Sequence, residues 1–187
     1  MPRYMRFLVL SAFVTALTAI GALTSFTLPF LTLVPFSLQV FGVYLAGGLL
    51  PARWAFLSML TYLVLGAIGL PVFAEGAHGV AILVGPFSGY LWAYPIAAWA
   101  MARILRASDH KRRLILGLGV NLVIIYAGGM IGIMLTTGAS LIHALVEGVL
   151  PFIGWDMLKA ALAFPIIQKA RSFTLSRWGK QSYRQAS

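Results

Sequence analysis

The chain has 187 residues, of which 60% are hydrophobic and only 10% are charged. A soluble domain usually carries about 25% charged residues, so this composition excludes an ordinary water-soluble protein. It predicts an integral membrane protein with a single domain over residues 1–187. The absence of cysteine excludes disulfides and cysteine-ligated metals. The net charge of +10 does not predict nucleic-acid binding, because the basic residues lie between and after apolar runs.

Apolar runs separated by proline and glycine predict six membrane-spanning helices and an all-α fold. The first run follows Arg3 and Arg6, a pattern that also fits a signal peptide. The further runs and the lack of a clear cleavage site favour a first span that stays in the protein. The expected spans cover about residues 7–26, 36–50, 53–69, 84–105, 114–136 and 151–170. We expect residues 171–187 to form a polar cytoplasmic tail.

The basic residues predict how these spans are oriented. If the N-terminus is cytoplasmic, every lysine and arginine except Lys159 falls before the first span, at Arg53, in the joint at 103–113, or in 169–184. All of these segments then lie on the cytoplasmic side, as the positive-inside rule requires. The rule therefore predicts that both termini are cytoplasmic, which needs an even number of spans.

One aspartate and one lysine, Asp156 and Lys159, lie inside the sixth apolar run. Three residues apart on a helix, they share one face. Because a charge in the middle of a bilayer costs at least ~3 kcal/mol, this face must turn toward the protein interior or a watery cavity. The pair is either a structural ion pair or a binding site. We favour a binding site, because a buried ion pair adds little net stability.

The chemistry of the pair predicts the kind of solute it would bind. A carboxylate accepts hydrogen bonds from N–H groups, and an ammonium group binds an anion or a carbonyl. Asp156 lies roughly 8 Å from the expected outer end of the span, so a solute arriving from outside would reach it. Such a solute has N–H donors at one position and a carboxylate or carbonyl at another. Candidates to line its apolar part are Phe73, Tyr90, Phe152 and Trp155.

Four motifs in this order resemble the BioY family, the biotin-binding substrate components of energy-coupling-factor (ECF) transporters. They are VPFSLQVFGVYLAGGLLPARWAF (34–56), GLPVFAEGAHG (69–79), GPFSGYL (85–91) and PFIGWDMLKAALA (151–163). The chain differs from the usual family pattern at Glu75, Phe87, Ser88, Gly154 and Trp155. The resemblance implies six helices in the cytoplasmic membrane of a prokaryote, with a pocket near the outer surface that binds biotin without changing it.

The resemblance also implies roles for individual residues. Lys159 would hold an acceptor, foremost the biotin carboxylate, and Asp156 would accept the ureido hydrogens or orient Lys159. Gln39 would supply an amide. Further residues would shape the pocket wall: Phe73, Gly85, Gly89 and Tyr90.

Transport energy would have to come from other chains, because the sequence has no phosphate-binding Walker A loop. The resemblance implies two ATPase subunits and a membrane-embedded coupling subunit, with no cofactor on this chain. Ala12 and Ala16, continued by Ala19, are spaced for close helix contact in lipid, either with that subunit or inside the bundle. We assign them to docking, and we assign Gly128, Gly129 and Gly132 to internal packing.

Three other functions are possible from the sequence. An intramembrane hydrolase would use Ser88 with His143, but Ser88 stands in no nucleophile motif. A metal site would use Glu75, His78, His143 and Glu147, for which solvated loop positions are the simpler interpretation. A solitary vitamin carrier would keep the ligand and need no ATPase partners.

Overall fold

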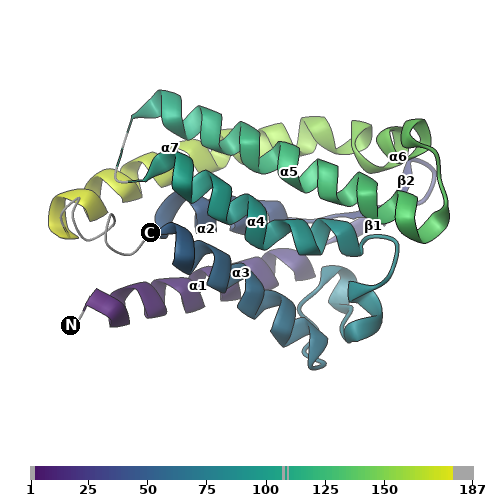
Figure 1. Cartoon of the computed structure of the whole chain (residues 1–187), viewed down its shortest axis with the longest axis horizontal. Coiled ribbons are helices and arrows are strands. Elements are labelled where there is room, and N and C mark those ends of the chain that lie inside the picture. The colour runs from purple at the N-terminus through teal and green to yellow at the C-terminus, as the bar shows by residue number, and fades with distance from the viewer. Residues whose placement is uncertain (1–2, 107, 109, 179–187) are drawn as a thin grey trace.

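The computed structural model describes residues 3–106, 108 and 110–178, and each of the six expected ranges contains a helix. These helices are α1 (Arg3–Leu23), α2 (Gln39–Leu49), α3 (Ala52–Ala67), α4 (Ser88–Leu105), α5 (Lys111–Thr137) and α7 (Ile153–Trp178). They run along the long axis of the molecule and alternate in direction (Figure 1). As a result, α1 begins at the same end of the bundle at which α7 finishes.

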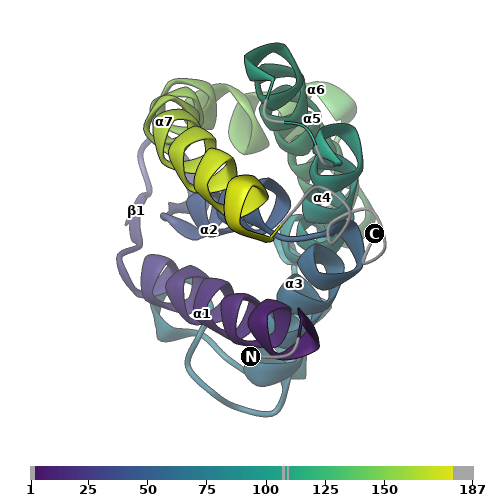
Figure 2. The same ribbon diagram turned by 90° about the vertical axis from the view of Figure 1, so that its left-hand side faces the viewer.

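Helix α2 occupies the middle of the bundle and contacts α1, α3, α4, α5 and α7 (Figure 2). Nine of its 11 residues are buried. A helix of this length spans about 16 Å, which is shorter than the hydrocarbon core of roughly 30 Å. Because its neighbours surround it, α2 does not need to cross that distance alone.

Three stretches of the described residues are helical, apolar and long enough to cross a membrane: Tyr4–Leu23, Lys111–Thr137 and Leu141–Thr174. The third stretch joins α6 (Leu141–Gly148), a 3-10 turn (Leu150–Phe152) and most of α7. Many large apolar side chains on α1, α5 and α7 are exposed, for example Phe13, Val123 and Leu162. These exposed side chains are suited to contact with lipid.

A short β-hairpin was not expected, and it corrects the all-α prediction. Strand β1 (Phe26–Leu28) pairs antiparallel with β2 (Thr32–Phe36). Aromatic contacts hold the hairpin in place: the ring of Phe36 stacks on Phe26 at 5.4 Å and lies 4.5 Å from Phe152. We expected the second helix to begin at about residue 36. Residues 36–38 instead precede this helix, which begins at Gln39. With α6 and two 3-10 turns (Ala74–Gly76 and Val80–Leu83), the hairpin closes the end of the bundle opposite the start of α1.

Glycines bring α4 and α5 into backbone contact. A Cβ atom on Gly89 would lie 2.1 Å from the carbonyl oxygen of Gly128 and 2.8 Å from Cα of Gly132. A Cβ on Gly129 would lie 2.0 Å from the ring of Tyr90. The prediction that Gly128, Gly129 and Gly132 serve internal packing is therefore confirmed.

The last helix differs from its expected end. We predicted a polar tail from residue 171, but α7 continues through Trp178. Arg171 is only 2% exposed, and its guanidinium donates to backbone carbonyls of other segments. These contacts explain why the helix continues where the sequence becomes polar. The remaining part of the expected tail, 179–187, lies outside the described residues.

Candidate binding site

A cavity of about 270 Å³ lies at the hairpin end of the bundle, between α2, α4, α5 and α7. Six of the predicted residues line it: Gln39, Phe73, Tyr90, Phe152, Asp156 and Lys159. The hairpin contributes Leu33, Val34 and Pro35, and the turns after α3 contribute Ala74, Glu75, Ala77 and Ile82. The sequence therefore located the principal residues of one cavity, although they come from four separate segments of the chain.

The ion pair forms the charged wall of this cavity. Lys159 Nζ lies 2.5 Å from Asp156 Oδ1, and the two side chains are 4% and 3% exposed. The ammonium group also donates to the carbonyl oxygen of Ser37 at 2.7 Å. The hydroxyl of Tyr126 donates to Asp156 Oδ2 at 2.8 Å. Each charge is thus held by its opposite and by one neutral group, as burial of an ion pair requires.

The lysine keeps a donor for a ligand. An ammonium group has three N–H donors, and the described contacts with Asp156 and Ser37 use two of them. Both side chains line the cavity. A bound acceptor such as a carboxylate or a carbonyl would take the third donor.

A second polar part of the cavity wall is neutral and is built around Gln39. Its side-chain nitrogen donates to the hydroxyl of Tyr62 at 2.6 Å, and its oxygen accepts from Tyr94 at 3.1 Å. The hydroxyl of Ser37 also donates to this oxygen at 3.2 Å. Tyr62 in turn donates to the carbonyl of Val72 at 2.7 Å. The amide predicted to serve the ligand is therefore already engaged in a network inside the protein.

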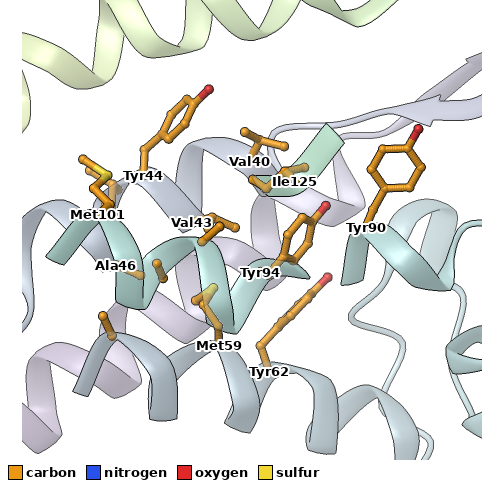
Figure 3. Close-up of a cluster of buried hydrophobic side chains, with 14 of the residues drawn as sticks. Val40, Val43, Tyr44, Ala46, Met59, Tyr62, Tyr90, Tyr94, Met101 and Ile125 are labelled. Atoms are coloured by element: carbon orange, nitrogen blue, oxygen red, sulfur yellow. The ribbon is translucent and has the colours of Figure 1, made fainter. Parts of the chain in front are cut away.

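Aromatic rings give the cavity its apolar surface. Phe73 is 1% exposed and meets the ring of Tyr62 edge-on at 5.5 Å. The Tyr90 hydroxyl donates to the carbonyl of Gly148 at 2.6 Å, which ties α4 to the end of α6. Figure 3 shows the hydroxyl groups of Tyr62, Tyr90 and Tyr94 pointing toward the same side. The combination of aromatic walls with a few fixed polar groups is typical of small-molecule sites.

Comparisons with known proteins agree with this geometry. The model of the BioY family matches residues 2–175. The chain belongs to the BioY family. A probable biotin transporter BioY of Pyrococcus horikoshii is 40% identical over 88% of this chain and 96% of its own length. The biotin transporter BioY of Thermotoga maritima is 33% identical over 92% of this chain and 100% of its own. A crystal structure described as the S-component for biotin from an ECF-type ABC transporter matches with a TM-score of 0.82 and 31% identity, over 90% of this chain and 92% of that one.

Two predicted pocket residues of this BioY protein do not line the cavity. Gly89 lies at the backbone contact between α4 and α5, as described above. Gly85 is partly buried in the turn before α4 and is also absent from the cavity wall. Trp155, which we expected to line the apolar part, lies outside the lining, although its ring centroid is 5.7 Å from Lys159 Nζ.

Sequence reasoning missed four polar groups of the site: the Ser37 carbonyl and the hydroxyls of Tyr62, Tyr94 and Tyr126. A tyrosine in an apolar helix usually belongs to the core, so sequence reasoning did not assign these three tyrosines to a binding site. Tyr126 offered the clearest signal, because its hydroxyl stands in the middle of a long apolar run and needs a partner when it is buried.

The residues considered for other functions do not converge on one site. Glu75 accepts a hydrogen bond from Thr27 at 2.5 Å, while His143 pairs with Glu147 at 3.3 Å on the exposed side of α6. Within the described residues, no group of three or more histidine, aspartate or glutamate side chains is placed to hold a metal. The hydrolase alternative is excluded by the family, whose relatives are named as transporters and not as enzymes.

Proposed function

We propose that this chain is the biotin-binding substrate component of an ECF-type transporter and takes up biotin across the cytoplasmic membrane of a prokaryote. One observation carries the proposal: an ammonium group with an unused donor lines an aromatic cavity in a chain that belongs to the BioY family. The relatives named above as biotin transporters, and the solved S-component for biotin, support the same ligand.

Biotin has chemical groups that match the cavity. Its bicyclic body and its arm are apolar and suit Phe73, Tyr90 and Phe152. Its carboxylate, or its ureido carbonyl, would accept the third N–H of Lys159. Since both oxygens of Asp156 already have a partner, we assign Asp156 chiefly to orienting Lys159. The chain itself would need no cofactor, because ATP would be hydrolysed on partner subunits.

The first experiment is equilibrium binding of radiolabelled biotin to the purified protein in detergent, with biotin amide and dethiobiotin as competitors. We expect saturable binding, and weaker competition by the amide, in which the carboxylate is masked. Equal competition by biotin and its amide would assign Lys159 to the ureido carbonyl instead. Absence of saturable biotin binding would refute the proposed function.

We further propose that residues 1–187 form one membrane domain that crosses the bilayer six times, with both termini in the cytoplasm. The alternating helix directions support six crossings (Figure 1). Because the native chain has no cysteine, single cysteines can report the sidedness of exposed positions. A membrane-impermeant maleimide should label His78→Cys in intact cells, and should label Arg112→Cys only after the membrane is opened. The reverse pattern would overturn this orientation.

The proposed partners are a coupling membrane subunit and two ATPase subunits. Ala12 and Ala16 are exposed on α1, so they are not needed for packing inside the bundle, whereas Ala19 packs against the core. We expect Ala12→Leu with Ala16→Leu to lower uptake and co-purification of the coupling subunit while biotin affinity stays unchanged. Gly119→Leu is a matched control, because it adds the same side chain at an open position on α5. Uptake in cells that lack any coupling subunit would favour the solitary carrier.

A further inference from the structure

Helix α7 buries a stripe of residues spaced four apart: Lys159, Ala163, Ile167 and Arg171. Residues at this spacing lie on one face of a helix. The two middle residues are apolar and fully buried, and each end carries a cation. This face packs against the central helix α2.

The two cations hold the two ends of α2. At the cavity, Lys159 donates to the carbonyl of Ser37, two residues before α2 begins. At the other end, Arg171 Nη1 donates to the carbonyl of Gly48 at 2.8 Å, in the last turn of α2. The two donors are 12 residues apart on α7 and the two acceptors are 11 residues apart along α2. The two helices are thus fastened at matching positions about 18 Å apart. We call the Lys159 contact at the cavity the outer fastening, and the Arg171 contact at the other end of α2 the inner fastening.

The inner fastening also includes the connection between α4 and α5. Arg171 Nε donates to the carbonyl of Ser108 at 2.9 Å, and Nη2 donates to the carbonyl of Arg106. Arg106 has a φ of 42°, a conformation that is costly for a residue other than glycine. A Cβ on Gly48 would lie 2.7 Å from Ile167, so the helices meet too closely there for a side chain. Because α7 and α2 lie so close here, the guanidinium reaches the carbonyls of Gly48, Arg106 and Ser108.

A proline in α7 makes the position of Lys159 depend on the contacts of Arg171. Pro165 lies inside α7, between Lys159 and Arg171. It removes one backbone hydrogen bond and favours a bend at this point. The direction of the outer half of α7 is therefore not set by α7 alone. It depends on contacts at both sides of the proline.

We propose that Arg171 is a positioning residue for the binding site: by fastening the inner half of α7 to α2, it sets where Lys159 meets Ser37 in the cavity. This inference rests on the proposed function, since it concerns the affinity for biotin. Arg171 does not line the cavity, so its effect on the ligand would pass through Lys159.

A double-mutant cycle tests this dependence, because two residues that act through one contact give non-additive effects. Biotin affinity is measured for Arg171→Met in the native background and in a Lys159→Met background. We expect a loss of about tenfold in the first background and less than twofold in the second. Equal losses in both backgrounds would overturn the proposal and leave Arg171 a purely structural residue.

Two further variants keep the test decisive. Arg171→Lys retains the charge but has only one nitrogen to donate to three carbonyls. If Arg171→Met does not fold, Arg171→Lys takes its place in the test, and we expect it to lose biotin affinity to a smaller extent. Lys169→Met removes a basic group from an exposed position of the same helix, and it should leave biotin affinity unchanged. A loss for Lys169→Met equal to that for Arg171→Met would attribute the effect to charge alone and overturn the proposal.

A ligand-free measurement separates this proposal from the proposed function. Spin labels on single cysteines at Leu38 and Ile153, both partly exposed near the cavity, report the distance between the start of α2 and the start of α7. Arg171→Met should broaden or shift this distance distribution, and an unchanged distribution would overturn the positioning role. Failure of the native protein to bind biotin would refute the function and leave this second readout to decide on Arg171.

Discussion

The two polar walls of the cavity are built in different ways. On the neutral wall, Gln39 satisfies the hydroxyls of Tyr62 and Tyr94 within the protein. On the charged wall, Asp156 and Lys159 hold each other, and the lysine still has one donor to offer. The neutral wall comes from α2 and α4, with Tyr62 of α3 hydrogen-bonded to Gln39, whereas the charged wall comes from α5 and α7 together with the Ser37 carbonyl.

This difference separates two tasks. A closed network of neutral hydrogen bonds fixes the positions of the rings, and so it defines the shape of the cavity. A charged group with an unused donor makes a hydrogen bond roughly twice as strong as a neutral one. We therefore expect the charged wall to determine affinity, and the neutral wall to determine stability and shape.

The largest loss of biotin affinity is expected for Lys159→Met, which removes the unused N–H donor of the ammonium group. A hydrogen bond to a charged group contributes about 1.5–3 kcal/mol, which corresponds to a loss of biotin affinity of roughly 10- to 150-fold. Equilibrium binding in detergent measures this loss. If Lys159→Met only lowers stability and leaves affinity unchanged, the pair is a structural ion pair.

This substitution also leaves Asp156 buried without its counter-charge, which by itself destabilises a protein by about 3–5 kcal/mol. The double variant Asp156→Asn with Lys159→Met removes both charges and serves as the control. We expect it to unfold near the temperature of the native protein and still to bind biotin weakly. Native affinity in the double variant would contradict a role for the charged wall in binding.

A smaller loss of biotin affinity is expected for Gln39→Leu, which removes the hydrogen bonds of Gln39 with Tyr62 and Tyr94 in the neutral wall. The buried hydroxyl of Tyr94 then loses its acceptor, at a cost of about 1–3 kcal/mol in the free energy of unfolding. Tyr62 keeps the carbonyl of Val72 as its acceptor, so we expect biotin affinity to fall by less than about tenfold. Thermal unfolding and binding are measured on the same sample. Loss of binding at unchanged stability would show that Gln39 contacts the ligand directly.

The ion pair could be predicted from the sequence because two charges in an apolar run have few physical explanations. The helices could be predicted because apolar runs recur along the chain, and proline or glycine marks several of their ends. The roles of Gly85 and Gly89 could not, because a glycine looks the same whether it admits a ligand or a neighbouring helix. Arg171 was assigned to the tail because only the tertiary contacts distinguish a buried arginine from a solvated one.

The hairpin was missed although its sequence carries a signal. Thr32, Val34 and Phe36 are buried while Leu33 is exposed, which is the period of two that marks a strand. The segment lies directly before an apolar helix and is itself apolar, so it was assigned in part to the second span. Because it lines the cavity, the strand also contributes a wall that helix prediction alone does not provide.

The smallest and sharpest test compares one hydroxyl from each wall. Tyr126→Phe removes a hydrogen bond to Asp156, whereas Tyr94→Phe removes one to Gln39. Both substitutions delete a single oxygen; the hydrogen bond between the neutral groups contributes about 1 kcal/mol, and the one to the carboxylate contributes about 1.5–3 kcal/mol. If the charged wall sets affinity, Tyr126→Phe lowers biotin binding about three- to tenfold, because Asp156 then holds Lys159 less firmly. Tyr94→Phe should change binding less than about twofold, since its hydroxyl serves only the closed network. Equal effects on binding would mean that both walls act as one network, and the division of tasks between them would be wrong.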